Sequence, residues 1–265
     1  MKKVRFYTLP PAGIKWPYIL LNMYNWRNES KKIGLKKLGN GFEHVIIDCA
    51  VDKWFFIEKR KDYPKKFLEK YAENAKMLSK KFEGCWITIP DYPDDYEHML
   101  CWRDGKDNVE LTFENIEKFS KIEGVNWIYP LQSRFLDLKS FKLSCIRMKE
   151  YEPEIIGIGT VCKTNKIDFI IKCVKEARKH FPNAWIHAFG PTLKSLKFIF
   201  PFINSFDSTS YFMKPSKNLE GQRMCKTMEE RIKYFKWWVQ KYEKIVGRKT
   251  IFDYFKETKC FKMGD

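Results

Sequence analysis

The chain has 265 residues, 44% of them hydrophobic and 17% aromatic, so it is too apolar for a disordered protein and long enough to bury one large core. Lys and Arg outnumber Asp and Glu by 50 to 33, and the resulting net charge of +17 favours a polyanionic partner, nucleic acid first; a basic surface that serves only solubility is the alternative. Because no apolar run suits a signal peptide or reaches the roughly 20 residues that span a bilayer, we expect an intracellular protein without membrane contact.

Short apolar runs alternate with amphipathic stretches along the chain, which is typical of parallel βα units. Eight such runs predict strands, the number that a closed (β/α)8 TIM barrel requires, and we expect residues 1–265 to form a single α/β domain. The first two runs are close together, so a hairpin before a shorter sheet is the alternative. The predicted strands are 4–9, 18–24, 44–50, 85–91, 126–132, 155–161, 184–190 and 203–209.

Apolar residues at steps of three and four predict helices between several of these strands. The predicted helices are 63–82, 166–181, 192–200 and 229–246, and we expect the aromatic residues of the last one in the core rather than as platforms for stacked bases. Residues 92–111 break the periodicity with acidic and turn residues. They predict a long loop over the active-site face.

The cysteines favour neither a zinc site nor disulfides. They form no CxxC pair and no tight cluster with histidine, and several lie in apolar runs where a thiol acts as a small hydrophobic group. We therefore expect mostly buried free thiols, no zinc subdomain, no bound metal and no cofactor. The eight cysteines are residues 49, 85, 101, 145, 162, 173, 225 and 260.

Polar residues and glycines gather at the predicted strand ends, where the βα loops of a barrel converge. An aspartate accepts hydrogen bonds from amino and imino groups, a glutamine donates to a carbonyl oxygen, and a glycine lets a flat ligand approach the backbone. The set therefore predicts a pocket for a purine with a guanine-like edge. The candidates are Asp48, Asp91, Gln132, Gly157, Gly159, His187 and Asp207.

Each candidate also has a purely structural interpretation. An aspartate at a strand end is often a helix N-cap, especially Asp207, which Ser and Thr follow. A histidine in an apolar strand, such as His187, is often a core residue whose ring nitrogens are hydrogen-bonded. Gln132 is able to cap a loop. The Gly157-x-Gly159 pair lacks the third glycine of a dinucleotide-binding motif. Only the whole set of candidates together indicates a purine-binding pocket.

The order and spacing of these residues resemble the tRNA-guanine transglycosylase superfamily, especially its shorter DNA 7-deazaguanine transglycosylase branch. The resemblance extends over most of the chain. Its most specific part is IGIGTVC, followed by HAFG and a strand that ends in SFDS. The similar segments are ILLNMYNW (19–26), VIIDCAVDKWF (45–55), ITIPDYP (87–93), IYPLQS (128–133), IIGIGTVC (155–162), WIHAFGP (185–191) and FINSFDSTSYF (202–212).

The resemblance implies an enzyme that exchanges guanine in DNA for a 7-deazaguanine base such as preQ0, with neither metal nor cofactor. Asp207 is then the nucleophile that forms a covalent glycosyl-aspartate, and Asp48 the general acid and base. The target nucleotide must be flipped out or single-stranded. The remaining implied roles are recognition of the base edge by Asp91, Gln132, Gly157 and Gly159, packing over the base ring by His187, and contact with the sugar or Asp48 by Asn22.

The chain departs from the superfamily in two places. Residues 48–51 read Asp-Cys-Ala-Val where Asp-Ser-Gly-Gly is usual, so we expect this loop to avoid backbone angles that only glycine adopts freely. No cysteine-rich zinc motif follows Asp207 and no separate RNA-binding domain is visible, which favours DNA over tRNA.

Three alternatives remain at this stage. The chain is also compatible with a tRNA enzyme without accessory parts, and with a non-catalytic nucleic-acid-binding barrel that partners another transglycosylase. A sugar-phosphate barrel enzyme is disfavoured because no glycine-rich phosphate site lies near the last two predicted strands. The sequence leaves the oligomeric state open.

Overall fold

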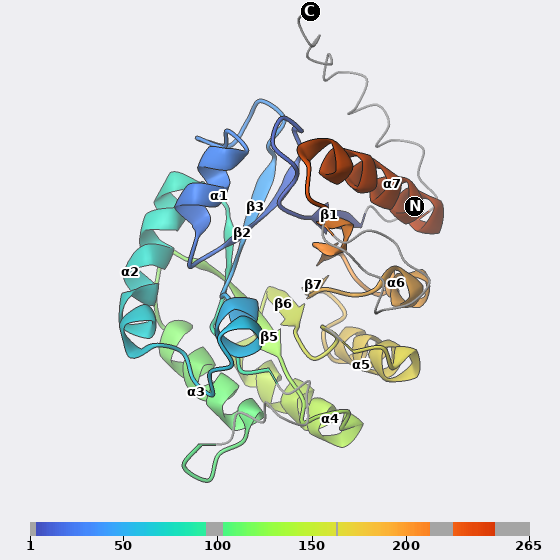
Figure 1. Ribbon diagram of the computed structural model, residues 1–265. Coiled ribbons are helices and arrows are strands. Elements are labelled where there is room, and N and C mark those ends of the chain that lie inside the picture. Colours follow the sequence, from blue (N-terminus) through green and yellow to red (C-terminus); the bar gives the residue numbers. More distant parts are fainter. Residues whose placement is uncertain (1–3, 94–102, 163, 213–224, 247–265) are drawn as a thin grey trace, which may run out of the picture.

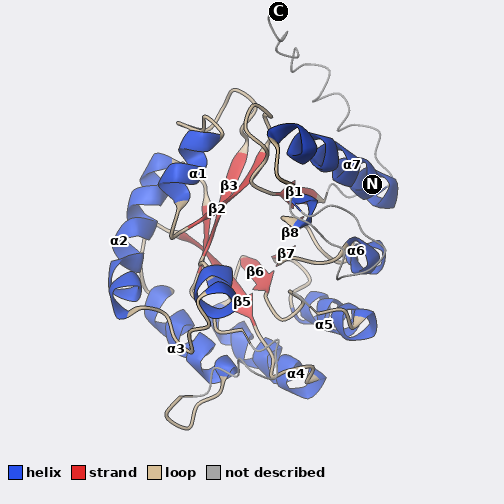
Figure 2. Ribbon diagram, in the orientation of Figure 1, coloured by secondary structure: helices blue, strands red, loops and turns tan. Residues whose placement is uncertain are grey.

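The computed structural model describes residues 4–93, 103–162, 164–212 and 225–246. Eight parallel strands form one sheet that curves into a ring, and helices surround it on the outside (Figures 1 and 2). The predicted (β/α)8 fold is therefore confirmed, and each strand lies within its predicted run. The strands are β1 Arg5–Tyr7, β2 Tyr18–Asn22, β3 His44–Asp48, β4 Trp86–Thr88, β5 Asn126–Leu131, β6 Ile155–Ile158, β7 Trp185–Ala188 and β8 Ser205–Asp207.

The ring closes between the first two strands. β1 pairs with β8 and β2 pairs with β3, both in parallel. Just beyond β1, Thr8 bridges Ile19 in the parallel sense: its N–H donates to the Tyr18 carbonyl at 3.1 Å, and its own carbonyl accepts from Leu20 N–H at 3.0 Å. The hairpin alternative is wrong, because β1 and β2 run in the same direction.

The four predicted helices are present as α2 Lys65–Lys81, α5 Ile167–His180, α6 Leu193–Ile199 and α7 Met228–Val246. Three rings of α7, those of Phe235, Trp238 and Tyr242, are buried as expected, and Trp238 lies 4.6 Å from Phe6 between ring centroids, whereas Trp237 is exposed. The structure adds helices that the periodicity did not reveal. They are α1 Trp26–Lys32, a π-helix Asp52–Ile57, α3 Asn108–Phe119 and α4 Leu138–Met148.

The prediction of a loop over residues 92–111 is wrong at its C-terminal end. α3 begins at Asn108, since the Asp107 side chain accepts from Glu110 N–H while the Glu110 side chain accepts from Asp107 N–H. This capping box stabilises the first helical turn. Of the remaining segment, residues 94–102 lie outside the described residues.

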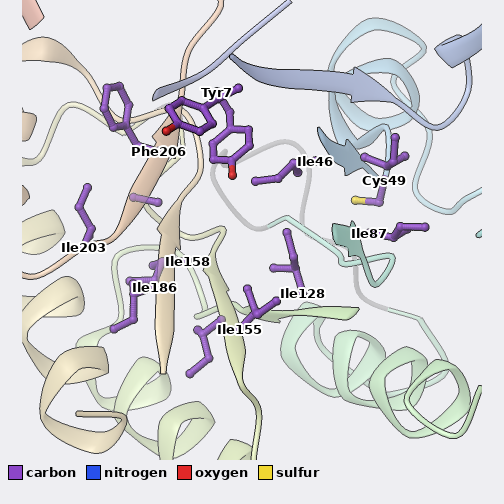
Figure 3. Packing of buried hydrophobic residues seen from close by; sticks show 14 of the residues in the cluster. Tyr7, Ile46, Cys49, Ile87, Ile128, Ile155, Ile158, Ile186, Ile203 and Phe206 are labelled. Carbon is purple, nitrogen blue, oxygen red and sulfur yellow. The ribbon is translucent and has the colours of Figure 1, made fainter. Parts of the chain in front are cut away.

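Branched aliphatic side chains from neighbouring strands line the core together with aromatic rings. Ile46, Ile87, Ile128, Ile158 and Ile186 are all fully buried, each on a different strand (Figure 3). Such β-branched residues pack well on a twisted, buried sheet. The barrel wall is therefore a stiff support for the groups at the strand ends.

All six described cysteines are free, and five of them are buried, as expected for thiols that act as small hydrophobic groups. Cys101 and Cys260 lie outside the described residues. None of the described helices combines the length and the apolar character needed to cross a bilayer.

Candidate active site

A cavity of about 230 Å³ opens at the C-terminal end of the strands. Its wall receives residues from nearly every strand end of the barrel, so groups that are distant in the chain meet around one space. The structure brings six of the eight predicted site residues into this wall: Asn22, Asp48, Asp91, Gln132, Gly159 and Asp207. Gly157 and His187 are not among the lining residues.

Asp207 ends β8 and is only 9% exposed. Its Oδ1 accepts from the Gly190 backbone N–H at 3.0 Å and contacts His187 Nε2 at 3.2 Å. Within the described part of the chain, Oδ2 has no hydrogen-bond donor. The N-cap interpretation of Asp207 does not hold, because Ser208 Oγ accepts from Ser210 N–H at the start of the following 3-10 turn.

His187 supports Asp207 from below the cavity. The ring is fully buried on β7, and its Nδ1 lies 2.9 Å from Ser205 Oγ. Trp185 Nε1 donates to the same oxygen at 2.8 Å. The hydroxyl hydrogen of Ser205 is then free to point at Nδ1, which leaves the ring hydrogen on Nε2, where it is donated to Asp207.

The expected packing of His187 over a base ring does not agree with this geometry. The aromatic ring in the cavity wall is that of Phe189, which contacts His187 edge-on with centroids 4.6 Å apart. Successive strand residues point to opposite sides, and the ring two positions beyond His187 lies nearer the strand end. His187 is therefore a positioning residue for Asp207.

Asp48 ends β3, directly opposite Asn22 in the register of β2 and β3. Its Oδ2 accepts from Ala50 N–H at 3.1 Å and from Asn22 Nδ2 at 3.4 Å, so Asn22 makes the expected contact with Asp48. Burial first, and then the charges of Asp52, Asp207 and Asp91, raise the pKa of Asp48 well above its usual value. A carboxyl group in this position favours holding a proton.

The loop after Asp48 contradicts the expectation that it avoids glycine-like angles. Ala50 has a φ of +75°, in the left-handed region that normally favours glycine. This conformation directs Ala50 N–H to the carboxylate of Asp48. The backbone geometry that glycine would provide is thus present, with a methyl group in place of the hydrogen.

Asp91 and Gln132 form a buried polar pair after β4 and β5. Gln132 Nε2 donates to Asp91 Oδ2, and Cys49 Sγ donates to Oδ1 at 3.0 Å. The Tyr63 hydroxyl donates to the backbone carbonyl of Asp91 at 2.8 Å. Burial raises the pKa of Asp91, while the two side-chain bonds lower it in part. Each carboxylate oxygen retains a second lone pair for a ligand.

Gly157 in β6 and Gly159 just beyond it make room for different side chains. A Cβ on Gly159 would lie 3.0 Å from Asp91 Oδ2, so only glycine leaves room for the Asp91–Gln132 pair at the cavity wall. A Cβ on Gly157 would lie 2.9 Å from Ile128 Cγ2 and 3.1 Å from the Phe189 ring. Gly157 thus accommodates Phe189, and the predicted direct contact of Gly157 with a ligand does not agree with this position.

Several lining residues were missed from the sequence, among them Glu29 and Gly190. Glu29 Oε2 accepts from Asn22 N–H at 2.6 Å, and burial raises the pKa of Glu29. Glu29 lies on α1, a helix of only seven residues whose periodicity is too short to recognise. Gly190 was visible only as part of the HAFG run.

The cavity is strongly acidic. Its lining holds five carboxylates and, among the described residues, neither lysine nor arginine. No three His, Cys, Asp or Glu residues of the described part are placed to bind a metal ion together. Such a wall favours a ligand that presents several hydrogen-bond donors, as the edge of a guanine does. The five carboxylates are Glu29, Asp48, Asp52, Asp91 and Asp207.

Comparison of the chain with models of protein families gives no match, and comparison with curated proteins gives no significant one. The family resemblance therefore remains an expectation from the motifs. What the residues are able to do chemically follows from the geometry of the cavity.

Proposed function

We propose that the chain is a base-exchange enzyme that replaces guanine in DNA with a 7-deazaguanine base, such as preQ0, through a covalent glycosyl-aspartate. The observation that carries this proposal is the meeting of Asp48 and Asp207 in one cavity, where the charge of Asp207 contributes to the raised pKa of Asp48. Two carboxylates in different environments are suited to different roles, one as proton donor and one as nucleophile.

In the proposed first step, Oδ2 of Asp207 forms a bond to C1′ of the nucleotide and the bond from C1′ to guanine N9 breaks. The electron pair of that bond leaves with guanine, and Asp48 supplies the proton that the departing base needs. The raised pKa of Asp48 favours retention of this proton until the base departs. Gly190 N–H and His187 hold Oδ1, which orients the carboxylate.

In the second step, Asp48 takes a proton from N9 of the incoming base, N9 bonds to C1′, and the bond to Asp207 breaks. Protons and charges then balance over the cycle, and no external energy source is needed. Asp91 and Gln132 offer an acceptor and a donor to the base edge, and Gly159 leaves space beside them. The same pocket serves both bases because they share that edge.

The test is incorporation of a labelled 7-deazaguanine base into guanine-containing DNA, with tRNA as the competing substrate. We expect label in DNA, and a glycosyl adduct on Asp207 detectable by mass spectrometry. Asp207→Asn should lower the exchange rate by about 1000-fold or more. The matched control is Asp168→Asn, which changes an exposed aspartate in the first turn of α5.

Three results would contradict the proposal. The first is exchange by Asp207→Asn at the rate of the unaltered chain, and the second is label in tRNA alone. The third is the absence of any exchange by a folded chain with DNA and a range of 7-deazaguanine bases.

A further inference from the structure

An exposed group of aromatic, apolar and cationic side chains adjoins the acidic cavity. We call it the Tyr24 ledge, and it consists of Tyr24, Lys53, Ile57 and Arg60 together with Trp54, which is largely buried. Tyr24 is 51% exposed and Ile57 70% exposed, although both are large hydrophobic residues. Exposed apolar surface beside a polar cavity is a common mark of a binding surface.

The ledge is continuous with the cavity along two segments of the chain. The π-helix contributes Asp52 and Phe56 to the cavity wall, and the next residue after each of them, Lys53 and Ile57, belongs to the ledge. Asn22 lines the cavity as well, and its side-chain oxygen accepts from the backbone N–H of Tyr24 at 3.1 Å. A ligand that extends out of the cavity on this side meets the ledge first.

The ring of Tyr24 is held in place but remains accessible. It contacts the ring of Trp54 edge-on, with centroids 5.7 Å apart, and Trp54 in turn packs against Phe67 of α2 at 5.3 Å. Trp54 is only 9% exposed, so the contact anchors Tyr24 to the core. Because Tyr24 itself is 51% exposed, part of this anchored ring remains accessible for stacking.

One cation lies over the Tyr24 ring and another over the Trp54 ring. Lys53 Nζ lies 5.1 Å from the Tyr24 ring centroid, and the Arg60 guanidinium carbon lies 5.8 Å from that of Trp54. Both cations share one carboxylate, Glu58, at 2.8 Å and 2.7 Å, so the three groups together carry a net positive charge. The Arg60 side chain is 49% exposed and has five N–H donors, more than the bond to Glu58 uses.

An exposed ring bordered by cations is suited to one kind of partner, an unpaired nucleotide. Its base stacks on the aromatic face, and its phosphate lies beside the cations. We infer that the Tyr24 ledge binds the nucleotide next to the one whose base enters the cavity, in single-stranded DNA. The inference rests on the proposed function only for the identity of the base inside the cavity.

The test measures binding of a single-stranded oligonucleotide that has one guanine in a run of thymines, with fluorescent 2-aminopurine beside the guanine. The full chain is used in an Asp207→Asn background, where we expect exchange to be about 1000-fold slower. We expect binding to quench the 2-aminopurine by stacking on Tyr24. Tyr24→Ala should remove this quenching and weaken binding by about tenfold, whereas Tyr24→Phe should retain both.

The chain offers a matched control in α7. Trp237 is 38% exposed there, and Lys241 Nζ lies 5.6 Å from its ring centroid, so it is also an exposed ring beside a cation. Trp237→Ala should leave binding and quenching unchanged. Arg60→Gln should lower the slope of log K against log salt by about 0.7, the value for one phosphate contact in a single strand.

The ledge assignment fails if Tyr24→Ala binds and quenches like its parent, or if Trp237→Ala loses as much. The two proposals fail separately. Exchange by the unaltered chain together with Tyr24-independent binding would overturn the ledge alone. Tyr24-dependent binding without any exchange would retain the ledge and overturn the base-exchange function.

Discussion

The two ends of the barrel are built in opposite ways. At the N-terminal end, the first residues of five strands form a cluster of four rings and one cation: Arg5, Tyr18, His44, Trp86 and Trp185. The Arg5 guanidinium lies 4.7 Å from the Trp185 ring centroid and 5.3 Å from that of Tyr18. Trp86 contacts Trp185 at 5.1 Å and His44 at 4.4 Å. Burial, together with Arg5, lowers the pKa of His44 to about 4, so Arg5 is the cation among these five residues.

At the C-terminal end, three strands end in a carboxylate or an amide at the wall of a cavity. Asn22, Asp48 and Asp207 are the last residues of β2, β3 and β8. Carboxylates that repel one another destabilise this end, while the rings at the other end pack closely. Under the proposed function, stability is concentrated at one end and chemistry at the other, as in barrel enzymes generally.

The sharpest test of this division is Asp48→Asn. The amide oxygen is still able to accept from Ala50 N–H, but the side chain no longer carries a transferable proton or a charge. We expect the rate of base exchange to fall by about 100-fold or more, the usual contribution of a general acid. We also expect the variant to be more stable than the parent, since it avoids the free-energy cost of either protonating Asp48 or burying its charge beside other carboxylates.

The stability gain should depend on pH. Because the pKa of Asp48 is raised in the folded chain, the native state holds a proton at pH values where the unfolded chain has lost it. The free energy of unfolding of the parent therefore falls as pH rises. The variant lacks this contribution because asparagine does not titrate. Melting should show a gain of about 2–4 °C at pH 8 and a smaller one at pH 5. A variant that melts below its parent at pH 8 would refute the division.

Arg5→Met, at the N-terminal end of the barrel, should have a smaller effect on stability and should destabilise the chain. The methionine retains most of the apolar stem but loses the cation between two rings, so the free energy of unfolding should fall by about 1 kcal/mol. The exchange rate should not change. The matched control is Arg147→Met, which removes an exposed cation 4.2 Å from the Phe113 ring centroid and should cost less in a urea titration. A loss of exchange in Arg5→Met would show that the two ends are coupled.

The sequence predicted the barrel because alternation of apolar runs and amphipathic helices is a local pattern that the chain keeps along its length. It failed where the pattern is short or irregular. α1 has only seven residues, and the π-helix Asp52–Ile57 does not have the 3.6-residue period of an α-helix. α3 was assigned to a loop because acidic and turn residues precede it, although its capping box is visible in Asp107 and Glu110.

The sequence identified most residues of the site, but it predicted their arrangement less well. Asp48 and Asp207 could be placed together because strand ends converge in any barrel. Whether His187 and Gly157 reach the cavity or lie beneath its wall depends on where each strand stops relative to its neighbours. Sequence alone does not give that register. Glu29 could not be found at all, because it reaches the cavity from a helix.

The smallest expected effect concerns Ala50, whose left-handed φ of +75° is the local strain at the acidic end. Ala50→Gly removes about 1 kcal/mol of strain and about 0.8 kcal/mol of methyl burial, so the two changes nearly cancel. The matched control is Ala75→Gly in α2, which is equally buried but helical. There the lost methyl and the lower helix propensity add, and we expect a loss of about 2 kcal/mol.

Urea titration of both variants checks this difference. If Ala50→Gly lost as much stability as Ala75→Gly, the positive φ would carry no strain, and the orientation of Ala50 N–H toward Asp48 would have no energetic cost. A near-neutral Ala50→Gly would instead indicate that the chain tolerates strain next to its proposed general acid, because the rigid barrel holds that loop in place.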